Sequence, residues 1–162
     1  LPLSVQYAEI EQEYLESLQA EQDRTYWYNL LCDAPRGVLE RYLNKSQTLT
    51  SHGDTITISL QEVAASRLRA VAINNGLSVY AIILGSLASV LYSLSGQTDI
   101  VLGTPVANRE LLPPDVRTRS IGHFANIVPV RLCVDPTKKV RDFISETQKR
   151  LSEMLVHQAY PY

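Results

Sequence analysis

Residue types that carry recognisable chemistry are scarce in this chain of 162 residues, which has two cysteines, three histidines, one methionine and one tryptophan. The cysteines, Cys32 and Cys133, are too few and too far apart for a disulfide framework or a metal-ligand spacing. Each lies in an apolar run of the sequence. We therefore expect two small buried side chains in a reducing compartment, and no cysteine nucleophile.

An excess of charge of either sign is also missing. The 15 Lys and Arg residues nearly balance the 17 Asp and Glu residues, which gives a formal charge of −2. This balance excludes the electrostatic footprint of a protein that binds nucleic acid or an anionic membrane surface. The opening residues 1–4 have neither the basic region nor the apolar stretch of a signal peptide, so we expect a cytoplasmic location. The missing initiator methionine predicts that the chain is part of a longer protein.

The chain does have enough apolar sequence for a core, with 45% hydrophobic and 20% charged residues. This composition is typical of one globular domain. Apolar residues at helical spacing predict helices between residues 4 and 33, with the polar stretch Gln19–Thr25 between two helical segments. Pro35 and Gly37 end this region. Residues 36–54 are polar and aperiodic, and predict a loop.

Three stretches have the pattern of strands. Thr55–Leu60 alternates apolar and polar residues, and Asp99–Val106 is apolar enough for a buried strand. Phe124–Val134 places its even-numbered residues on one face, and all of them except Asn126 are apolar. The polar residues 107–120 predict a loop between the last two strands.

Capping signals mark the helices in the middle of the chain. Ser59 followed by Glu62 makes a capping box, and Gly76 suits a left-handed C-terminal cap for the helix that follows the box. Ser78 is placed to cap the next helix, which ends near Gly96. These signals predict two consecutive helices with a short turn between them.

A final helix is predicted over Thr137–His157. Its core stripe comprises Val140, Phe143, Ile144, Thr147, Leu151, Met154 and Leu155. On its solvent side, Glu146 is placed to pair with Arg150.

The stretch Leu77–Leu94 contains no charged residue over 18 positions, which is long enough for a membrane span. Four serines and the lack of flanking basic residues favour a helix buried in a soluble core instead.

Three or four strands mixed with four or five helices define an α/β chain. A small number of strands with helices over them predicts a two-layer sandwich.

The three histidines, His52, His123 and His157, do not form a site in the sequence. No two of them have metal-ligand spacing, and none lies in a dense cluster of acidic and basic residues. The chain also lacks a G-x-S-x-G nucleophile elbow, a phosphate-binding loop and a dinucleotide fingerprint. The residues therefore predict no metal and no complete catalytic cluster.

Asn126 is the polar residue on the otherwise apolar face of its strand, so its amide needs hydrogen-bond partners or a polar cleft. One interpretation is an amide that pairs with neighbouring backbone. The other is a residue that lines a cleft and orients a substrate carbonyl or amide. Arg109 and Arg131 lie next to apolar runs, and we interpret both as structural, either in buried ion pairs or with the charge extended to water.

Three segments resemble motifs of one family, the condensation domains of nonribosomal peptide synthetases. SGQTDIVLGTPVANR, at Ser95–Arg109, is similar to the family stretch sGQ-DivvGtPvAnR. IGHFANIVPVR, at Ile121–Arg131, resembles IGxFVNTxxxR, and HQAYPY, at His157–Tyr162, resembles HQDYPFE. Gln6–Glu9 and Tyr26-Trp27 echo a fourth motif, YxDYAxW…YWxxxL. The motifs occur in the family's order along essentially the whole chain.

The chain departs from these motifs at four positions. Ala125 and Ile127 stand where Val and Thr are usual around the asparagine. Ala159 replaces the usual Asp, and Tyr162 stands where Phe is common. These differences affect the fine specificity that the motifs imply, rather than membership of the family.

The resemblance implies two lobes like those of chloramphenicol acetyltransferase, with a mixed sheet covered by helices. It divides this chain into a linker-helix region, 1–35, and a carboxy-terminal-lobe sandwich, about 55–162. The family's catalytic signature, HHxxxDG, belongs to the amino-terminal lobe, and no adjacent histidine pair occurs here. We therefore expect this chain alone to be inactive, because positioned general bases contribute about 10²–10⁴-fold to such reactions.

By motif, the resemblance places Asn126 at the reaction channel and Gly103, Thr104 and Pro105 near the junction between the lobes. It makes four residues structural supports: Arg109, Arg131, His157 and Gln158. The expected partners are the amino-terminal lobe, peptidyl carrier domains and the adenylation domain of the same synthetase. No cofactor of its own is implied, because carrier domains deliver the substrates on phosphopantetheine arms.

Three other hypotheses remain open from the sequence. The chain is a non-catalytic module that docks a carrier domain, or a relative of the epimerisation or heterocyclisation type, or a membrane protein. The motif at Ile121–Arg131 favours the ordinary condensation form over its relatives.

Overall fold

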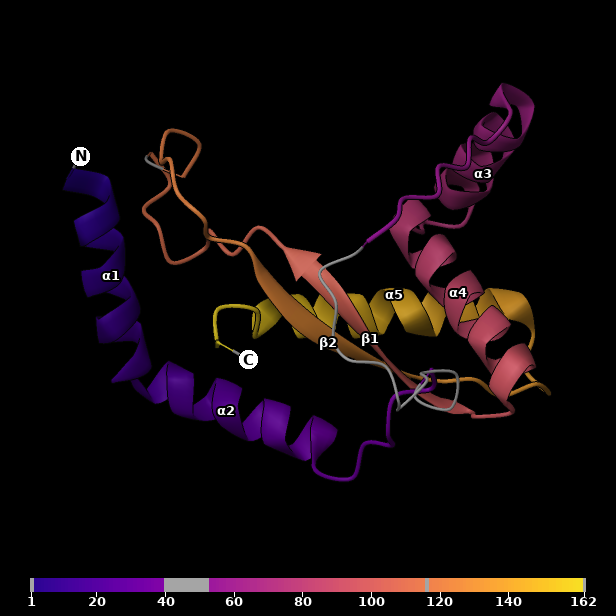
Figure 1. Ribbon diagram of the computed structural model, residues 1–162, viewed down its shortest axis with the longest axis horizontal. Coiled ribbons are helices and arrows are strands. Elements are labelled where there is room, and N and C mark those ends of the chain that lie inside the picture. Colours follow the sequence, from indigo (N-terminus) through magenta and orange to yellow (C-terminus); the bar gives the residue numbers. More distant parts are fainter. Residues whose placement is uncertain (1, 40–52, 116, 162) are drawn as a thin grey trace. The chain divides into compact units, whose positions relative to one another are not determined.

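The computed structural model describes residues 2–39, 53–115 and 117–161, and His52 lies outside them. Helices and strands follow one another in an α/β arrangement, as the sequence predicts (Figure 1). The elements are α1 (Pro2–Leu15), α2 (Leu18–Leu31), α3 (Glu62–Asn74), α4 (Val79–Ser95), β1 (Asp99–Val106), β2 (Asn126–Cys133) and α5 (Val140–Val156).

The chain divides into two compact units. Unit 1 comprises Leu1–Ala34, Val101–Leu132 and Lys149–Tyr162, and unit 2 comprises Pro35–Ile100 and Cys133–Gln148. The helices α1 and α2, which the resemblance assigns to a linker region, thus belong to the same unit as most of the two strands.

The break between α1 and α2 lies at residues 16 and 17, earlier than the sequence predicts (Figure 1). Ser17 caps α2, because its hydroxyl accepts a hydrogen bond from the backbone N–H of Ala20 at 3.2 Å. The polar stretch Gln19–Thr25 is therefore helical rather than a connection. One of its members, Asp23, is buried and supplies a polar function that apolar periodicity does not reveal.

The strands β1 and β2 form a two-stranded antiparallel sheet. Fewer strands are present among the described residues than the three or four predicted. The predicted face of β2 is confirmed, because Val128, Val130 and Leu132 are buried. Ile127, on the opposite face, is 64% exposed. Only Pro129 departs from this alternation within the strand, since it is buried as well.

The prediction of a strand at Thr55–Leu60 is wrong. These residues have no strand structure, and the side chains of Ile56 and Ile58 are 87% and 84% exposed. Alternation selects a strand only where a neighbouring strand supplies hydrogen bonds, and no described residue does so here. The capping box at Ser59 is not formed either, since α3 begins after Gln61 without a side-chain cap.

Both predicted caps of α4 are confirmed. The Ser78 hydroxyl accepts from the backbone N–H of Ala81 at 3.0 Å, and Gly96 has the left-handed φ of 72°. At Gly85 the helix is within contact distance of α5, because an added Cβ would lie 2.5 Å from Cδ1 of Ile144. The first half of α5 therefore packs against α4 inside unit 2.

The prediction that α4 is buried on all sides is wrong for the described residues. One face is buried, at Ala81, Leu84, Gly85, Ala88 and Leu91. The other face is exposed, at Tyr80, Ile83, Leu87, Val90 and Leu94. Among the described residues, no single helix meets the length and hydropathy of a membrane span. Together α3 and α4 meet these criteria, but the chain bends by 106° between them.

Most of the predicted core stripe of α5 is buried, namely Phe143, Ile144, Thr147, Leu151 and Met154. Val140 and Leu155 are exceptions, at 76% and 44% exposed, because they lie near the ends of the helix. The predicted pair of Glu146 with Arg150 is not formed. Glu146 instead contacts Lys138 at 2.9 Å, and Arg150 contacts Glu153 at 3.1 Å.

Both cysteines are exposed thiols, contrary to the prediction of burial. Cys32 is the C-terminal cap of α2, and Cys133 lies on the exposed face of β2.

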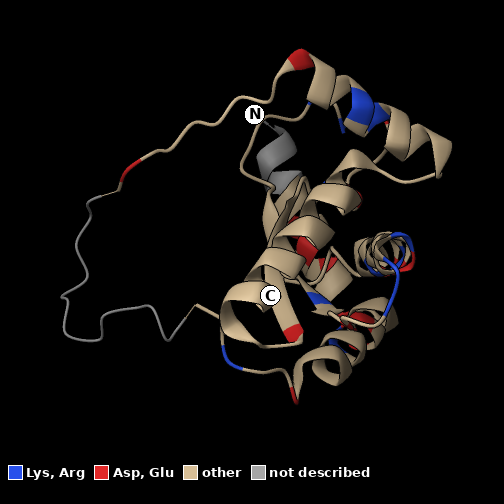
Figure 2. Cartoon of the chain, turned by 90° about the vertical axis from the view of Figure 1, so that its right-hand side faces the viewer, with Lys and Arg blue, Asp and Glu red and all other residues tan. Residues whose placement is uncertain are grey.

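Acidic and basic residues are interspersed along the elements. For example, α3 begins with acidic Glu62 and carries basic residues further along (Figure 2).

Candidate functional site

The side chain of Asn126, at the start of β2, is held by three hydrogen bonds. Its Nδ2 donates to the carbonyls of Gln158 at 3.2 Å and Tyr160 at 3.0 Å. Its Oδ1 accepts from the backbone N–H of Ile127 at 2.9 Å. Both amide hydrogens are therefore used inside the chain, and one lone pair of Oδ1 is left for another donor. These bonds match the interpretation of Asn126 as an amide that pairs with backbone.

The two carbonyls belong to a turn that follows α5, residues 157–160, which we call the clamp turn. Inside it, the backbone N–H of Tyr160 donates to the carbonyl of His157 at 3.4 Å. Nε2 of buried Gln158 donates to the carbonyl of Leu155 at 2.8 Å. From α2, the indole Nε1 of Trp27 donates to the carbonyl of His157 at 3.0 Å. The clamp turn is thus bonded to α2 as well as to Asn126.

Asp23 is the polar centre of this region, and its side chain is 2% exposed. Its carboxylate accepts from the Tyr14 hydroxyl at 2.6 Å and from Nε2 of Gln19 at 2.8 Å. Nδ1 of His157 lies 2.7 Å from the same carboxylate. Because an ionised carboxylate only accepts hydrogen bonds, this contact places a proton on Nδ1.

Burial, together with the hydrogen bond to Asp23, raises the pKa of Tyr14 well above its ordinary value. The Tyr14 hydroxyl therefore stays protonated and donates across the neutral pH range. Asp23 was missed by the sequence analysis. The available signal was the i, i+4 spacing of Gln19, Asp23 and Trp27, which places one acid and two hydrogen-bond donors on the same side of a helix.

The ring of Tyr26 stacks on the imidazole of His157, with centroids 3.8 Å apart and planes 17° from parallel. Burial, with a smaller contribution from Glu153, raises the pKa of Tyr26. The imidazole is thus fixed in two ways, by the carboxylate in its plane and by the phenol ring on its face.

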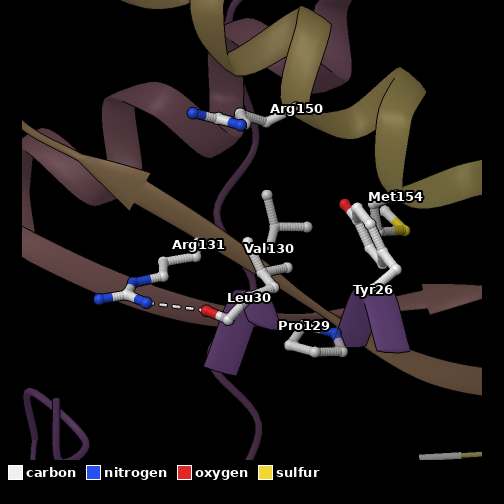
Figure 3. Close-up of a pocket in the computed structure, with 7 residues that line it drawn as sticks. All are labelled: Tyr26, Leu30, Pro129, Val130, Arg131, Arg150 and Met154. Atoms are coloured by element: carbon white, nitrogen blue, oxygen red, sulfur yellow. Dashed lines mark hydrogen bonds between the residues drawn. The ribbon is translucent and has the colours of Figure 1, made fainter. Parts of the chain in front are cut away.

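Arg131 joins β2 to the end of α2. Its Nη1 donates to the carbonyl of Leu30 at 2.8 Å (Figure 3). The same atom contacts Oδ1 of Asp33 at 2.5 Å. The hydrogen bond from Arg131 lowers the pKa of Asp33. The carbonyl of Leu30 lies in the last turn of α2, where carbonyls have no helical partner, and the guanidinium of Arg131 supplies its hydrogen bond. The structural interpretation of Arg131 agrees with these bonds.

The depression around Arg131 has no room for a water-sized molecule, so it is not a ligand cavity. Figure 3 shows its lining: Tyr26, Leu30, Pro129, Val130, Arg131, Arg150 and Met154.

Arg109 organises the loop after β1. Its Nη1 donates to the carbonyls of Arg117 at 2.7 Å and Ser120 at 2.9 Å, and its guanidinium lies 4.5 Å from the centre of the Phe124 ring. The preceding residue, Asn108, has a φ of 50° and a buried Oδ1 with no hydrogen-bond partner among the described residues. Arg109 therefore supports the loop that leads into β2.

Gly103, Thr104 and Pro105 lie inside β1. Thr104 is buried, while its two neighbours are exposed. A Cβ added at Gly103 would lie 3.0 Å from Cγ2 of Ile127, so the glycine lets the two strands come close beside Asn126. The structure brings Asn126, His157 and Gln158 into one cluster. The expected position of Gly103–Pro105 at a junction between lobes stays a prediction.

The cluster contains one acid, Asp23, and one imidazole, His157. No group of three or more His, Cys, Asp or Glu side chains suited to a metal ion occurs within residues 2–39, 53–115 and 117–161. The chemistry that these side chains offer is hydrogen bonding and orientation.

The family model described as Condensation domain matches residues 2–162, so this chain belongs to the condensation-domain family. Bacitracin synthase 1 of Bacillus licheniformis is 30% identical over 159 residues, which are 96% of this chain and 3% of that protein. Surfactin synthase subunit 1 of Bacillus subtilis (strain 168) is 29% identical over 153 residues, covering 94% of this chain and 4% of that protein.

Solved structures share the fold. The first condensation domain of the CDA synthetase has a TM-score of 0.77 at 24% identity, with 93% of this chain and 32% of that one covered. The four-domain nonribosomal peptide synthetase holo-AB3403, bound to AMP and glycine, also has a TM-score of 0.77, at 23% identity, with 98% and 12% covered. This chain thus spans about a third of a solved condensation domain and a few per cent of the synthases.

Proposed function

We propose that this chain forms part of the reaction chamber of an amide-forming condensation domain in a nonribosomal peptide synthetase. The acceptor amine attacks the carbonyl carbon of the donor thioester, the C–N bond forms and the C–S bond breaks. The sulfur takes the bonding electrons and, in the end, the proton that the amine loses. The match of the family model over residues 2–162 carries this proposal, because it includes the motif around Asn126.

Asn126 is the residue that we assign to the substrate passage. Since its Nδ2 hydrogens are bonded to Gln158 and Tyr160, its free capacity is as an acceptor through Oδ1. In this proposal Asn126 accepts a hydrogen bond from the N–H of the acceptor amine or of a substrate amide. It does not donate to the donor carbonyl. Gly103, Thr104 and Pro105 lie near the lobe junction, and Arg109, Arg131, His157 and Gln158 support the passage.

The proton acceptor comes from outside this chain, on an amino-terminal lobe with an HHxxxDG motif. No adjacent histidine pair occurs in the sequence of 162 residues. The chain alone is therefore expected to be inactive, since it offers orientation without a positioned base. Two carrier domains bring the substrates on phosphopantetheine arms, an adenylation domain of the same synthetase loads them, and the reaction takes place in the cytoplasm.

Joining this chain to an amino-terminal condensation lobe tests the proposal. Two loaded carrier domains are added, and intact-protein mass spectrometry measures the peptidyl thioester on the acceptor carrier. The joined protein is expected to form the amide, whereas this chain alone is expected to form none. Replacing the second histidine of the HHxxxDG motif by alanine is the matched control. Carrier binding without amide formation in the joined protein would contradict the proposal and favour a docking module.

A further inference from the structure

A continuous set of contacts runs from the interior of α1 and α2 to the amide of Asn126. Tyr14 donates to Asp23, and Asp23 holds Nδ1 of His157 at 2.7 Å. His157 begins the clamp turn, whose carbonyls at Gln158 and Tyr160 receive both hydrogens of Asn126. Each contact in the set lies within unit 1.

The clamp turn is held from two sides. On one side, α2 contributes the Asp23 carboxylate, the Trp27 indole and the stacked ring of Tyr26. On the other side, Asn126 of β2 donates to the carbonyls of Gln158 and Tyr160. A shift of the turn therefore moves the two acceptors that set the orientation of the Asn126 amide.

From this geometry we infer that Asp23 and His157 are positioning residues for Asn126. The inference rests on the proposed function, in which Asn126 presents Oδ1 to a substrate N–H. Asp23 fixes the proton on Nδ1 and the plane of the His157 ring, and thereby places the clamp turn. The turn then directs both N–H bonds of Asn126 inward, which leaves Oδ1 as the group that faces the reacting amine.

The Asp23→Asn substitution keeps the shape of the side chain but replaces one carboxylate oxygen by an NH2 group. That group takes the position of Oδ1, where it opposes the Nδ1–H of His157, or the position of Oδ2, where it faces the Tyr14 hydroxyl. In both placements His157 loses its charge-assisted hydrogen bond to a carboxylate, so the ring is held less firmly. Asn126 then loses its fixed orientation, and kcat is expected to fall about tenfold while KM changes little, because small misplacements in a reaction site are costly.

The inference is tested by a double-mutant cycle in the intact synthetase that contains this chain. The variants are Asp23→Asn, Asn126→Ala and the two together. If Asp23 acts through Asn126, Asp23→Asn lowers kcat about tenfold alone and has no further effect in the Asn126→Ala background. A purely structural role would lower kcat by the same factor in both backgrounds, and that result overturns the inference.

Hydrogen exchange supplies a second measurement in the same proteins. The peptide that covers residues 155–161 is expected to exchange faster in the Asp23→Asn variant than in the wild type. Gln12→Ala is the control, because it removes an exposed hydrogen bond from Gln12, on α1, to Glu16 and lies outside the clamp turn. Equal exchange in the wild type and the Asp23→Asn variant overturns the inference.

His157→Asn keeps the inference testable if Asp23→Asn does not fold. Its amide supplies a donor near the position of Nδ1, so it should retain more of kcat than His157→Phe, which keeps the ring but loses the donor. Equal loss in both variants contradicts the assigned role of the hydrogen bond.

An unchanged kcat in Asn126→Ala overturns the proposed function, and the inference falls with it. A lowered kcat in Asn126→Ala with normal kcat and exchange in Asp23→Asn overturns the inference alone.

Discussion

Nδ1 of His157 lies 2.7 Å from the carboxylate of Asp23, a residue 134 positions earlier in the chain. The acid comes from the middle of α2, and the imidazole comes from the turn after α5. This pair links the two ends of the sequence inside one compact unit. It also explains why a charged residue is buried in a helix of largely polar composition: the carboxylate has three hydrogen-bond partners.

Asp23→Ala is expected to destabilise the fold strongly. The substitution leaves the Tyr14 hydroxyl and the His157 Nδ1–H without an acceptor, and each unsatisfied buried donor costs about 1–3 kcal/mol. We expect the free energy of unfolding to fall by about 3 kcal/mol, measured by urea denaturation. Gln12→Ala should change it by less than about 0.5 kcal/mol. A loss for Asp23→Ala that is no larger than the loss for this control would contradict the described role of the carboxylate.

Gly85→Ala tests the close packing of α4 on the first half of α5. Glycine in a helix interior lowers the free energy of unfolding by about 0.5–1 kcal/mol relative to alanine, so the substitution would stabilise a helix face with open space around it. Here the added Cβ would lie 2.5 Å from Cδ1 of Ile144, and overpacking typically costs about 1–3 kcal/mol. We expect a net loss of about 1 kcal/mol in thermal or chemical unfolding.

Ile144→Val is the matched background for this test, because it removes the Cδ1 atom in question. In that background, Gly85→Ala is expected to be neutral or stabilising. The same loss in both backgrounds would show that the Ile144 contact is not the cause.

The elevated pKa of Tyr14 predicts a loss of stability in alkali. The unfolded state releases the phenolic proton near the ordinary value of 10.0, while the folded state holds it to higher pH. The contribution of Tyr14 is therefore complete below about pH 10 and is lost as pH rises from there toward the folded pKa. Tyr14→Phe should reduce the slope of unfolding free energy against pH above pH 10. An equal slope in the wild type and Tyr14→Phe would refute this assignment.

Local patterns predicted the elements whose determinants are close in sequence. The serine and glycine caps of α4 and the buried face of β2 follow from short-range signals, and all are present. The segment Thr55–Leu60 failed because a strand also depends on a neighbouring strand, which its own alternation cannot report. The second apolar face of α4 is exposed among the described residues, and the apolar sequence of the helix does not distinguish this face from the buried one.

The candidate site was only partly predictable for the same reason. Asn126 was recognisable as a polar residue on an apolar strand face, and the family motif marked His157 and Gln158. Asp23 lies in no quoted family motif and on no apolar strand face. Its spacing from Gln19 and Trp27 was a local signal, but its contact with His157 spans 134 positions. A polar residue within a polar helical stretch is most simply interpreted as solvated, and only the three-dimensional structure shows that Asp23 is buried.

The most direct test of the account is single-turnover amide formation by the intact synthetase with alanine in place of Asn126, using carrier domains preloaded with donor and acceptor. We expect the rate of amide formation to fall at least about tenfold, because the acceptor for the substrate N–H is removed, while carrier binding is unchanged. A rate equal to that of the unaltered enzyme would mean that Asn126 only ties the clamp turn to β2, and the proposed reaction-chamber role would be wrong.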